Sequence, residues 1–377
     1  MRYFVAMDSF KGSLTSLQAG AAVCDAIQLL EQDAVVTVRP LADGGEGTVE
    51  AIAAGLGGET ITLSVTGPLQ TPVDAKYCIL PDGSTAVMEM AAAAGLPLVP
   101  IDAHNPLETT TFGVGELIKD AVSRGCRHFI MGIGGSATND GGFGMLRALG
   151  FEFSDKIGNP IPLGAKGLAA LADISADRVL PELAACTFRV ACDVTNPLCG
   201  ENGCSAVFGP QKGATPEAIA DMDRWLKNYA SIAAGISDNA DPEYPGAGAA
   251  GGLGFAFLTF LNATLESGVQ IILEETGMED AIKNADIVIT GEGKLDAQTV
   301  MGKAPIGVAK LAKKHGKKVL AFAGCIGEGA ETCLEHGIDA YYAISPAALP
   351  LKEALDPEIA YQNLKNTAYE ALQQLYI

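Results

Sequence analysis

Basic residues are scarce in this chain of 377 residues, in which 25 Lys and Arg stand against 45 Asp and Glu and the formal net charge is −20. A nucleic-acid partner requires a basic face, and anionic membranes attract basic segments. The charge therefore argues against both kinds of partner. It leaves room for a small anionic substrate, because lysines, backbone amides and a divalent cation can supply positive charge locally.

Long hydrophobic runs are also missing. No uninterrupted apolar stretch reaches the roughly 18 residues of a membrane span, and glycines and polar residues break the nearest candidate, residues 247–265. The opening residues Met1–Asp8 lead straight into a polar loop and lack a signal-peptide pattern. We therefore expect a cytoplasmic protein without a membrane partner.

The cysteines lack metal-site spacing. There are 9 of them, an odd number, with no CxxC pattern, which is typical of reduced thiols. Cys192, Cys199 and Cys204 have only distant histidines and make a poor zinc site. The 4 histidines lie outside the glycine- and acid-rich motifs, which argues against Ser/His/Asp hydrolase chemistry.

Glycine and aliphatic residues are plentiful: 45 Gly and 48% hydrophobic content accompany only 6% aromatic residues. This composition suits helices packed closely on sheets, and the length favours two domains. The first ~60 and last ~90 residues repeat an apolar strand, a polar turn and a helix. Residues 61–65 and 73–80 instead alternate, and residues 85–90 run apolar, which looks like antiparallel strands. We predict an α/β fold: residues 1–65 and 285–377 form a doubly wound, Rossmann/flavodoxin-like parallel-sheet domain, residues 66–284 form an inserted mixed α/β domain, and the active site lies in the cleft between them.

A glycine-rich loop, residues 132–144, follows one apolar strand and precedes a helix. This arrangement points backbone N–H groups at an anion, although a tight turn needing positive φ is an equal alternative. A second such loop, Pro245–Gly254, opens another helix. Close packing of small residues explains this second loop as well.

Acidic residues close nearly every apolar strand of the chain. The five positions are Asp8, Asp43, Asp140, Asp193 and Glu292. Carboxylates at one sheet edge suit Mg²⁺ held jointly with substrate phosphates. Lysines near them can neutralise phosphoryl charge, and they are Lys11, Lys212, Lys294 and Lys303. The residues alone therefore predict phosphoryl transfer to a small hydroxylated acceptor.

Six blocks spread in order over the chain resemble bacterial type-1 glycerate kinases. They are Asp8–Ser13, Pro40–Thr48, Gly134–Gly142, Phe208–Gly213, Pro245–Gly254 and Gly291–Gly293. The resemblance implies ATP-dependent phosphorylation of D-glycerate with Mg²⁺ in a two-domain α/β fold. Members are mostly glycerate 2-kinases that make 2-phosphoglycerate, and some carry the 3-kinase label.

The resemblance leaves individual roles open, and we assign them as hypotheses. Asp193, Lys11 and Asp8 are the expected catalytic residues, with Asp193 as the base or the group that orients the glycerate hydroxyl. The expected nucleotide and phosphate ligands are Gly134, Gly135, Ser136, Thr138, Asn139, Gly248, Gly251, Gly252 and Lys294. Asp43, Asn196, Lys212 and Glu292 are expected to bind substrate, and Asp8, Asp43 and Glu292 are the candidate Mg²⁺ ligands.

Rival functions stay open at this point. A sugar-acid oxidoreductase would need a dinucleotide fingerprint after the first strand, and Ser9–Gly12 is not one. A nucleotide-binding sensor would keep the loops without a competent base. The position phosphorylated, and the choice between a monomer and a homodimer, do not follow from the sequence.

Overall fold

The computed structural model describes residues 1–41, 47–346 and 349–374. The chain divides into two compact units, and each is described by itself. Unit 1 comprises the described parts of residues 1–43, 50–56 and 269–377, and unit 2 those of 44–49 and 57–268. Within the described ranges, no helix is long and apolar enough to cross a membrane.

The unit boundaries differ from the predicted positions 65 and 285. β3 (Glu59–Thr66) pairs antiparallel with β4 (Pro72–Ile79) along its whole length, so it belongs to the sheet of unit 2. At the other boundary, α10 (Met278–Lys283) contacts α11 (Ala304–Lys314) of unit 1. The predicted placement of the active site between the two units stays a prediction.

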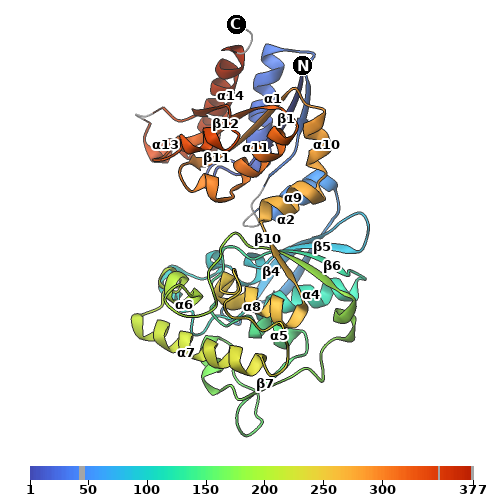
Figure 1. The fold of residues 1–377 in the computed structure, drawn as a ribbon, viewed down its shortest axis with the longest axis vertical. Coiled ribbons are helices and arrows are strands. Elements are labelled where there is room, and N and C mark those ends of the chain that lie inside the picture. The colour runs from blue at the N-terminus through green and yellow to red at the C-terminus, as the bar shows by residue number, and fades with distance from the viewer. Residues whose placement is uncertain (42–46, 347–348, 375–377) are drawn as a thin grey trace. The chain divides into compact units, whose positions relative to one another are not determined.

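Unit 1 is built on a five-stranded sheet in the order β13-β12-β11-β1-β2, with every pairing parallel. Its strands are β1 (Arg2–Met7), β2 (Val35–Val38), β11 (Ile287–Leu295), β12 (Lys318–Ile326) and β13 (Ala340–Ala343). Its helices are α1 (Ser16–Leu30), most of α2 (Thr48–Leu56), α9 (Gly268–Glu275), α10, η6 (Thr299–Met301), α11, α12 (Thr332–Glu335), α13 (Leu351–Ala354) and α14 (Pro357–Gln373) (Figure 1).

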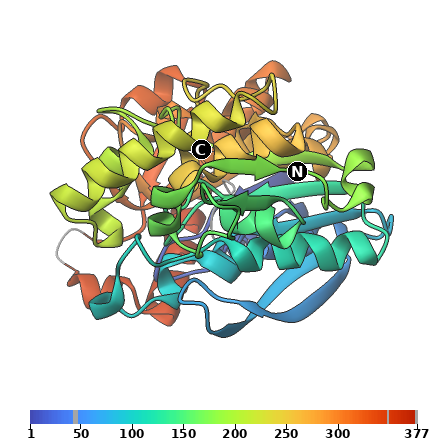
Figure 2. The same cartoon turned by 90° about the horizontal axis from the view of Figure 1, so that it is seen from below.

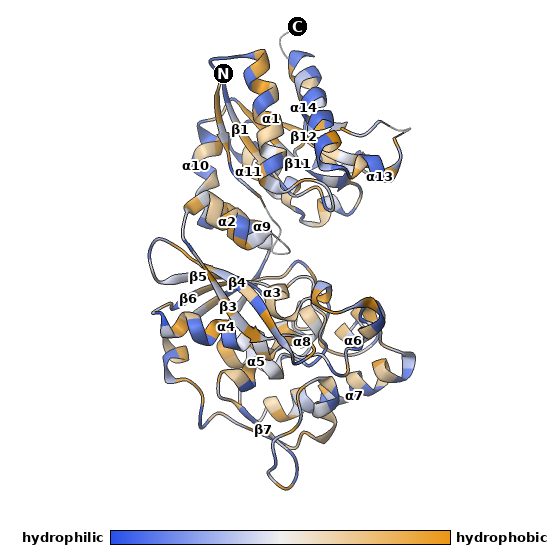
Figure 3. Cartoon of the chain, turned by 180° about the vertical axis from the view of Figure 1, so that it is seen from behind, coloured by the Kyte–Doolittle hydropathy of each residue, from blue (hydrophilic) through white to orange (hydrophobic). Residues whose placement is uncertain are grey.

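Helices cover both faces of this sheet. Tyr3, Val5 and Met7 of β1 share one core with residues of α1 and α14, whereas the alternating Phe4 and Ala6 are buried on the opposite face, where α11 contacts β1 and β11. The ribbon of α1 shows hydrophobic and hydrophilic patches in turn, because one side of the helix is buried (Figure 3). The doubly wound parallel sheet predicted from the sequence is confirmed.

The chain order reverses between β1 and β11. From β1 the chain passes through α1 to β2 on one side, and from β11 through α11 to β12 and β13 on the other. In open α/β sheets, ligands bind outside the carboxyl ends of the strands at such a switch point. Asp8 follows the end of β1 there, and Glu292 is the first residue of β11 beyond its pairing with β1, because Met7 pairs with Gly291.

Glu292 and Lys294 lie within a strand. The sequence predicts a strand that ends near residue 290, but β11 continues to Leu295 because Glu292 pairs with Ala323 and Lys294 with Cys325 of β12. The glycines at 291 and 293 hid this extension, since glycine is depleted in strands. Beyond the end of β1, β11 and β12 therefore continue as a two-stranded ribbon.

Unit 2 contains a six-stranded mixed sheet in the order β10-β9-β6-β5-β4-β3. β5 (Thr85–Glu89), β6 (His128–Gly132), β9 (Thr187–Ala191) and β10 (Thr264–Glu266) run parallel, and β4 pairs antiparallel with both β3 and β5. A separate hairpin joins β7 (Glu152–Ser154) and β8 (Asp173–Ser175). The mixed α/β architecture predicted for the inserted domain is confirmed.

The helices of unit 2 enclose its own hydrophobic core, which is separate from that of unit 1. They are α3 (Ala91–Ala94), α4 (Phe112–Ser123), α5 (Phe143–Ala148), α6 (Cys204–Phe208), α7 (Pro216–Ala233), α8 (Ala249–Leu261) and the short 3₁₀ turns η1 (Leu96–Leu98), η2 (Ile101–Ala103), η3 (Ala165–Ala170), η4 (Pro181–Ala185) and η5 (Pro210–Lys212). The amphipathic α7 carries the single tryptophan, Trp225, which packs against this core. It runs along the outside of unit 2 (Figure 2, yellow).

Candidate active site

Two carboxylates stand at the switch point of unit 1. The half-buried Asp8 follows β1; its N–H donates to the Gly291 carbonyl at 2.9 Å, and its carboxylate accepts the Ser9 N–H at 2.6 Å. Glu292, on the neighbouring strand, is only 6% exposed. The pair combines one accessible and one buried acid at the edge where the fold places ligands.

Glu292 is held by two neighbours from the segment that follows β11. Thr299 Oγ1 donates to its Oε1 at 2.7 Å, and Lys303 Nζ lies 3.4 Å from its Oε2. Burial raises the pKa of Glu292, while the Thr299 hydrogen bond and the Lys303 charge lower it. Sequence reasoning missed Thr299, because a threonine seven residues after an acid carries no recognisable pattern.

The two predicted lysines of unit 1 differ in their surroundings. Lys11 is exposed, and its backbone lies beside Gly293 of β11. Lys294 Nζ is 2.9 Å from the Asp296 carboxylate, so its charge is already engaged by a neighbouring acid. Lys11 is therefore the better candidate to meet a phosphate. Asp43, predicted to bind substrate and metal, lies outside the described residues.

The acid of the first glycine loop has a structural role. Asp140 is fully buried and accepts hydrogen bonds from Thr111 N and Thr111 Oγ1, each at 2.9 Å, and from Gly142 N at 3.1 Å. Its carboxylate thus ties the loop to the start of α4. Asp140 is one of the five acids that the sequence places at an edge suited to Mg²⁺, and this expectation is wrong for Asp140, because the side chain is 0% exposed and the protein's own donors surround it.

The loop has an exposed tip and a buried base. Gly134 and Gly135 are exposed, whereas Ser136, Thr138 and Asn139 are buried. Thr109 Oγ1 donates to the Ala137 carbonyl at 2.8 Å. At the base, Asn139 Nδ2 donates to Ser205 Oγ of α6 at 2.8 Å, a contact that the sequence does not signal.

The second glycine loop packs directly on the first. Residues 250–252 adopt left-handed conformations, with φ of 53°, 68° and 91°, and the Gly251 carbonyl accepts the Gly141 N–H at 2.9 Å. A Cβ on Gly251 would lie 2.1 Å from the Thr138 carbonyl oxygen. The close approach of two backbones therefore accounts for Gly251, and phosphate binding by Gly248, Gly251 and Gly252 stays a prediction.

Asp193 and Asn196, two further predicted site residues, follow the end of β9. Asp193 is exposed, and its Oδ1 accepts the Gly268 N–H at 3.3 Å. The carbonyl of Asn196 accepts the Gly248 N–H at 3.0 Å, and its side-chain amide donates to the Asn202 carbonyl at 2.9 Å. Within unit 2, the first glycine loop thus follows β6, and Asp193 and Asn196 follow β9. The second glycine loop packs against both of these segments.

Lys212 is expected from the sequence to bind substrate, but its side chain is buried. Its side chain is 2% exposed, and Nζ donates to Ser136 Oγ at 2.8 Å and to the Thr138 carbonyl at 2.6 Å. Burial lowers its pKa to about 8, opposed by the Cys204 thiol and Asp140. The ammonium therefore contacts the base of the first glycine loop instead of open solvent.

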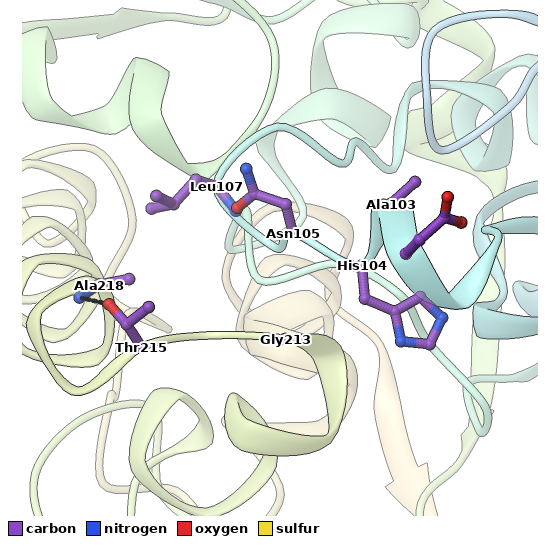
Figure 4. Close-up of a pocket in the computed structure, with 8 residues that line it drawn as sticks. Ala103, His104, Asn105, Leu107, Gly213, Thr215 and Ala218 are labelled. Carbon is purple, nitrogen blue, oxygen red and sulfur yellow. Dashed lines mark hydrogen bonds between the residues drawn. The ribbon is translucent and has the colours of Figure 1, made fainter.

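A pocket of about 520 Å³ lies elsewhere on unit 2, and none of the predicted site residues lines it (Figure 4). Three of its polar side chains have partners: Asn105 Oδ1 accepts the Leu107 N–H, Thr215 Oγ1 caps α7, and His104 Nε2 lies 3.2 Å from the Val99 carbonyl. The fourth, Asp102, is exposed, and an exposed acid does not suit an anionic substrate.

The donor set of unit 1 fits a magnesium ion that arrives with a nucleotide. Among the described residues, no three His, Cys, Asp or Glu side chains gather closely enough to cage a metal. Mg²⁺ commonly keeps several waters and binds one or two carboxylates together with substrate phosphates. Asp8 and Glu292, on adjacent strands, can supply such carboxylates.

Comparisons with known proteins cover nearly the whole chain and all point to the same family. The glycerate kinase family model matches residues 3–376. A glycerate kinase of Haemophilus influenzae is 46% identical and spans 100% of this chain and 99% of its own, and a glycerate 2-kinase of Escherichia coli K12 is 45% identical over 97% and 95%. The crystal structure of a protein described as glycerate kinase 2 from Salmonella typhimurium LT2 superimposes with a TM-score of 0.89, at 44% identity, covering 100% of this chain and 98% of the other. The chain belongs to the glycerate kinase family.

Proposed function

We propose that this enzyme transfers the γ-phosphoryl group of ATP to the 2-hydroxyl of D-glycerate, giving 2-phospho-D-glycerate. The observation that carries the proposal is the 45% identity, over 97% of this chain, to a protein named glycerate 2-kinase. The geometry of each unit is compatible with it. Acids lie at the switch point of the parallel sheet of unit 1. In unit 2, the first glycine loop follows β6 and the second packs on the first.

Asp193 is the proposed base, or the group that orients the glycerate hydroxyl. Its carboxylate is exposed at the end of β9, and the Gly268 N–H fixes one of its oxygens. An aspartate in this position can accept the proton of an attacking hydroxyl, as kinases require. Asn196, three residues along the same segment, is proposed to contact the substrate.

Asp8 and Glu292 are the proposed carboxylate ligands of Mg²⁺, together with Asp43. When bound, the ion would offset negative charge on the phosphates during transfer. Lys11 at the same edge is proposed to contact phosphate oxygens. Lys303, 3.4 Å from Glu292, keeps that carboxylate oriented.

Proton-coupled phosphorus NMR of the product tests the proposal directly. Phosphate on the 2-oxygen has one neighbouring carbon-bound proton and gives a doublet, whereas phosphate on the 3-oxygen has two and gives a triplet. We expect a doublet that requires enzyme, ATP, D-glycerate and Mg²⁺ together. Chelation should abolish turnover, and added Mg²⁺ should restore it.

Each rival function predicts another result. A triplet would make the enzyme a glycerate 3-kinase. ATP binding without glycerate-dependent turnover would indicate a nucleotide-binding sensor, and reduction of a nicotinamide dinucleotide by a sugar acid would indicate an oxidoreductase.

A further inference from the structure

Unit 2 buries a lysine charge without an ionic partner. Both hydrogen bonds of Lys212 Nζ go to neutral oxygens of the first glycine loop, Ser136 Oγ and the Thr138 carbonyl. No described carboxylate forms an ion pair with it. A buried ammonium without an ion pair opposes folding, because neutral oxygens replace its hydration shell only in part. The buried Asp140 attracts the charge but does not offset this cost, since the pKa of Lys212 stays lowered. A fold that keeps such a charge suggests that an anion offsets it in the working enzyme.

The exposed tip of the same loop presents unused donors. Gly134 and Gly135 are exposed, and the backbone N–H groups of residues 134–136 donate to no described acceptor. Gly135 has a φ of +72°, a conformation that lets successive amides converge in an anion-binding nest. Ser136 Oγ accepts from Lys212 and so keeps its own hydrogen available for a ligand.

We propose that the amides of residues 134–136 and the Ser136 hydroxyl form a binding site for one anionic oxygen group, with Lys212 as its positioning residue. Lys212 acts through Ser136 and the Thr138 carbonyl, and it supplies positive charge from beneath the loop without touching the ligand. The group bound is the carboxylate of glycerate or a phosphate of the nucleotide. This identification of the ligands rests on the proposed function, but the anion site itself does not.

The alternative is that Lys212 only anchors the loop. The chain offers a neutral comparison in the same loop, since Thr109 Oγ1 donates to the Ala137 carbonyl at 2.8 Å and carries no charge. Removing a mere anchor lowers stability and leaves anion binding intact. Removing an isolated buried charge relieves its desolvation cost and weakens anion binding.

The first experiment compares Lys212→Met with Thr109→Val in the full chain, using inorganic phosphate as the probe. We expect Lys212→Met to melt at the same or a higher temperature and to bind phosphate about tenfold more weakly or worse, since a charge several ångströms away is lost. Thr109→Val should melt lower and bind phosphate like the parent. A Lys212→Met protein that melts lower with unchanged phosphate affinity would overturn the proposal.

The pH dependence of phosphate affinity gives an independent readout. With a pKa of about 8 for Lys212, opposed by the facing Cys204 thiol and Asp140, affinity in the parent should fall as pH rises through that value. Lys212→Met should lack this component. Lys212→Met can both melt lower and lose phosphate affinity, and the pH profile of the parent protein then settles the result. A phosphate affinity of the parent that does not change across about pH 8 rejects the role of the charge.

Kinetics then identify the ligand. A rise in the KM for D-glycerate alone assigns the site to the carboxylate, and a rise in the KM for ATP alone assigns it to a phosphate. Unchanged KM values with only kcat reduced would contradict the site. If the parent shows no glycerate-dependent turnover, the proposed function fails, while the phosphate measurement still tests the anion site.

Discussion

At the scale of single residues, Asp193 is exposed and accepts one backbone N–H from Gly268 at 3.3 Å. Asp193→Asn keeps an acceptor oxygen for that N–H but removes the charge and basicity. We expect kcat to fall by about 10²- to 10⁴-fold, the usual contribution of general acid–base catalysis. Circular dichroism and the melting temperature should match the parent. Asp173→Asn, at an exposed position of β8, is the control, and near-normal turnover by Asp193→Asn would exclude Asp193 as the base.

Glu292 gives a prediction on stability and pH. Its folded pKa is raised, with burial as the largest cause, whereas in the unfolded chain a glutamate titrates at about 4.3. As pH rises through this window, the unfolded chain loses the proton while the folded protein keeps it, so stability falls. Glu292→Gln lacks this loss. Its melting temperature minus that of the parent should therefore increase with pH across the window, although turnover is lost.

Glu279 provides a control of opposite sign. Hydrogen bonds from Lys314 and His315 lower the pKa of this half-buried carboxylate to about 2. Its contribution to stability is present above the unfolded pKa and disappears as pH falls through the folded one. The melting-temperature difference for Glu279→Gln should consequently become more negative as pH rises. Parallel pH profiles of Glu292→Gln and the parent would contradict the assigned burial of Glu292.

At the scale of elements, the contact between the two glycine loops can be tested with a matched pair of glycines. Gly251 and Gly83 have nearly the same φ, 68° and 67°. A Cβ at 251 meets the Thr138 oxygen at 2.1 Å, whereas a Cβ at 83 meets nothing within 4 Å. Gly83→Ala should cost about 1 kcal/mol for the backbone conformation, and Gly251→Ala about 2–4 kcal/mol, because overpacking is added.

Urea unfolding measures both variants. If the two substitutions cost the same, the loops would not be in the close contact described. If Gly251→Ala alone loses stability and turnover together, the contact positions the first loop for function. The pair therefore separates the conformational requirement for glycine from the steric one.

The elements also show where sequence reasoning works. The sequence pattern predicts a helix from Ser16 to Leu30, and α1 has these bounds, because a Thr15 capping box and an apolar face are local signals. The extension of β11 was missed, since it depends on pairing with β12, which is distant in sequence. Likewise, the burial of Asp140 and Lys212 depends on Thr111 and on Ser136, and no spacing in the chain announces those contacts.

At the scale of the whole molecule, the fold class followed from the repeated strand–turn–helix pattern at both ends and the alternating pattern between them. The boundaries of the units depend on contacts between segments that are distant in sequence. They therefore differ from the predicted boundaries by up to sixteen residues, with unit 1 resuming at residue 269 instead of 285. The structure places the described candidate site residues mostly in loops and near strand ends, and their membership of the site stays a prediction. Their surroundings could not be predicted, because an exposed acid such as Asp193 and a buried one such as Asp140 look alike in sequence.

The separate cores of the two units lead to a prediction about unfolding. Trp225 is the single tryptophan, and it packs against the core of unit 2, so its fluorescence reports that unit alone. Far-UV circular dichroism reports the helices of both units. Because two-state unfolding is expected for single domains and fails for multidomain chains, we expect the two probes to give urea midpoints that do not coincide.

A stabilising substitution confined to unit 1 sharpens this test. At neutral pH, Glu292→Gln should move the circular dichroism transition and leave the Trp225 transition in place, because Glu292 and its partners Thr299 and Lys303 all belong to unit 1. Gly251→Ala should shift the Trp225 transition to lower urea. If both probes shift together in both variants, the units unfold as one cooperative structure, and the division of the chain into two independent cores would be wrong.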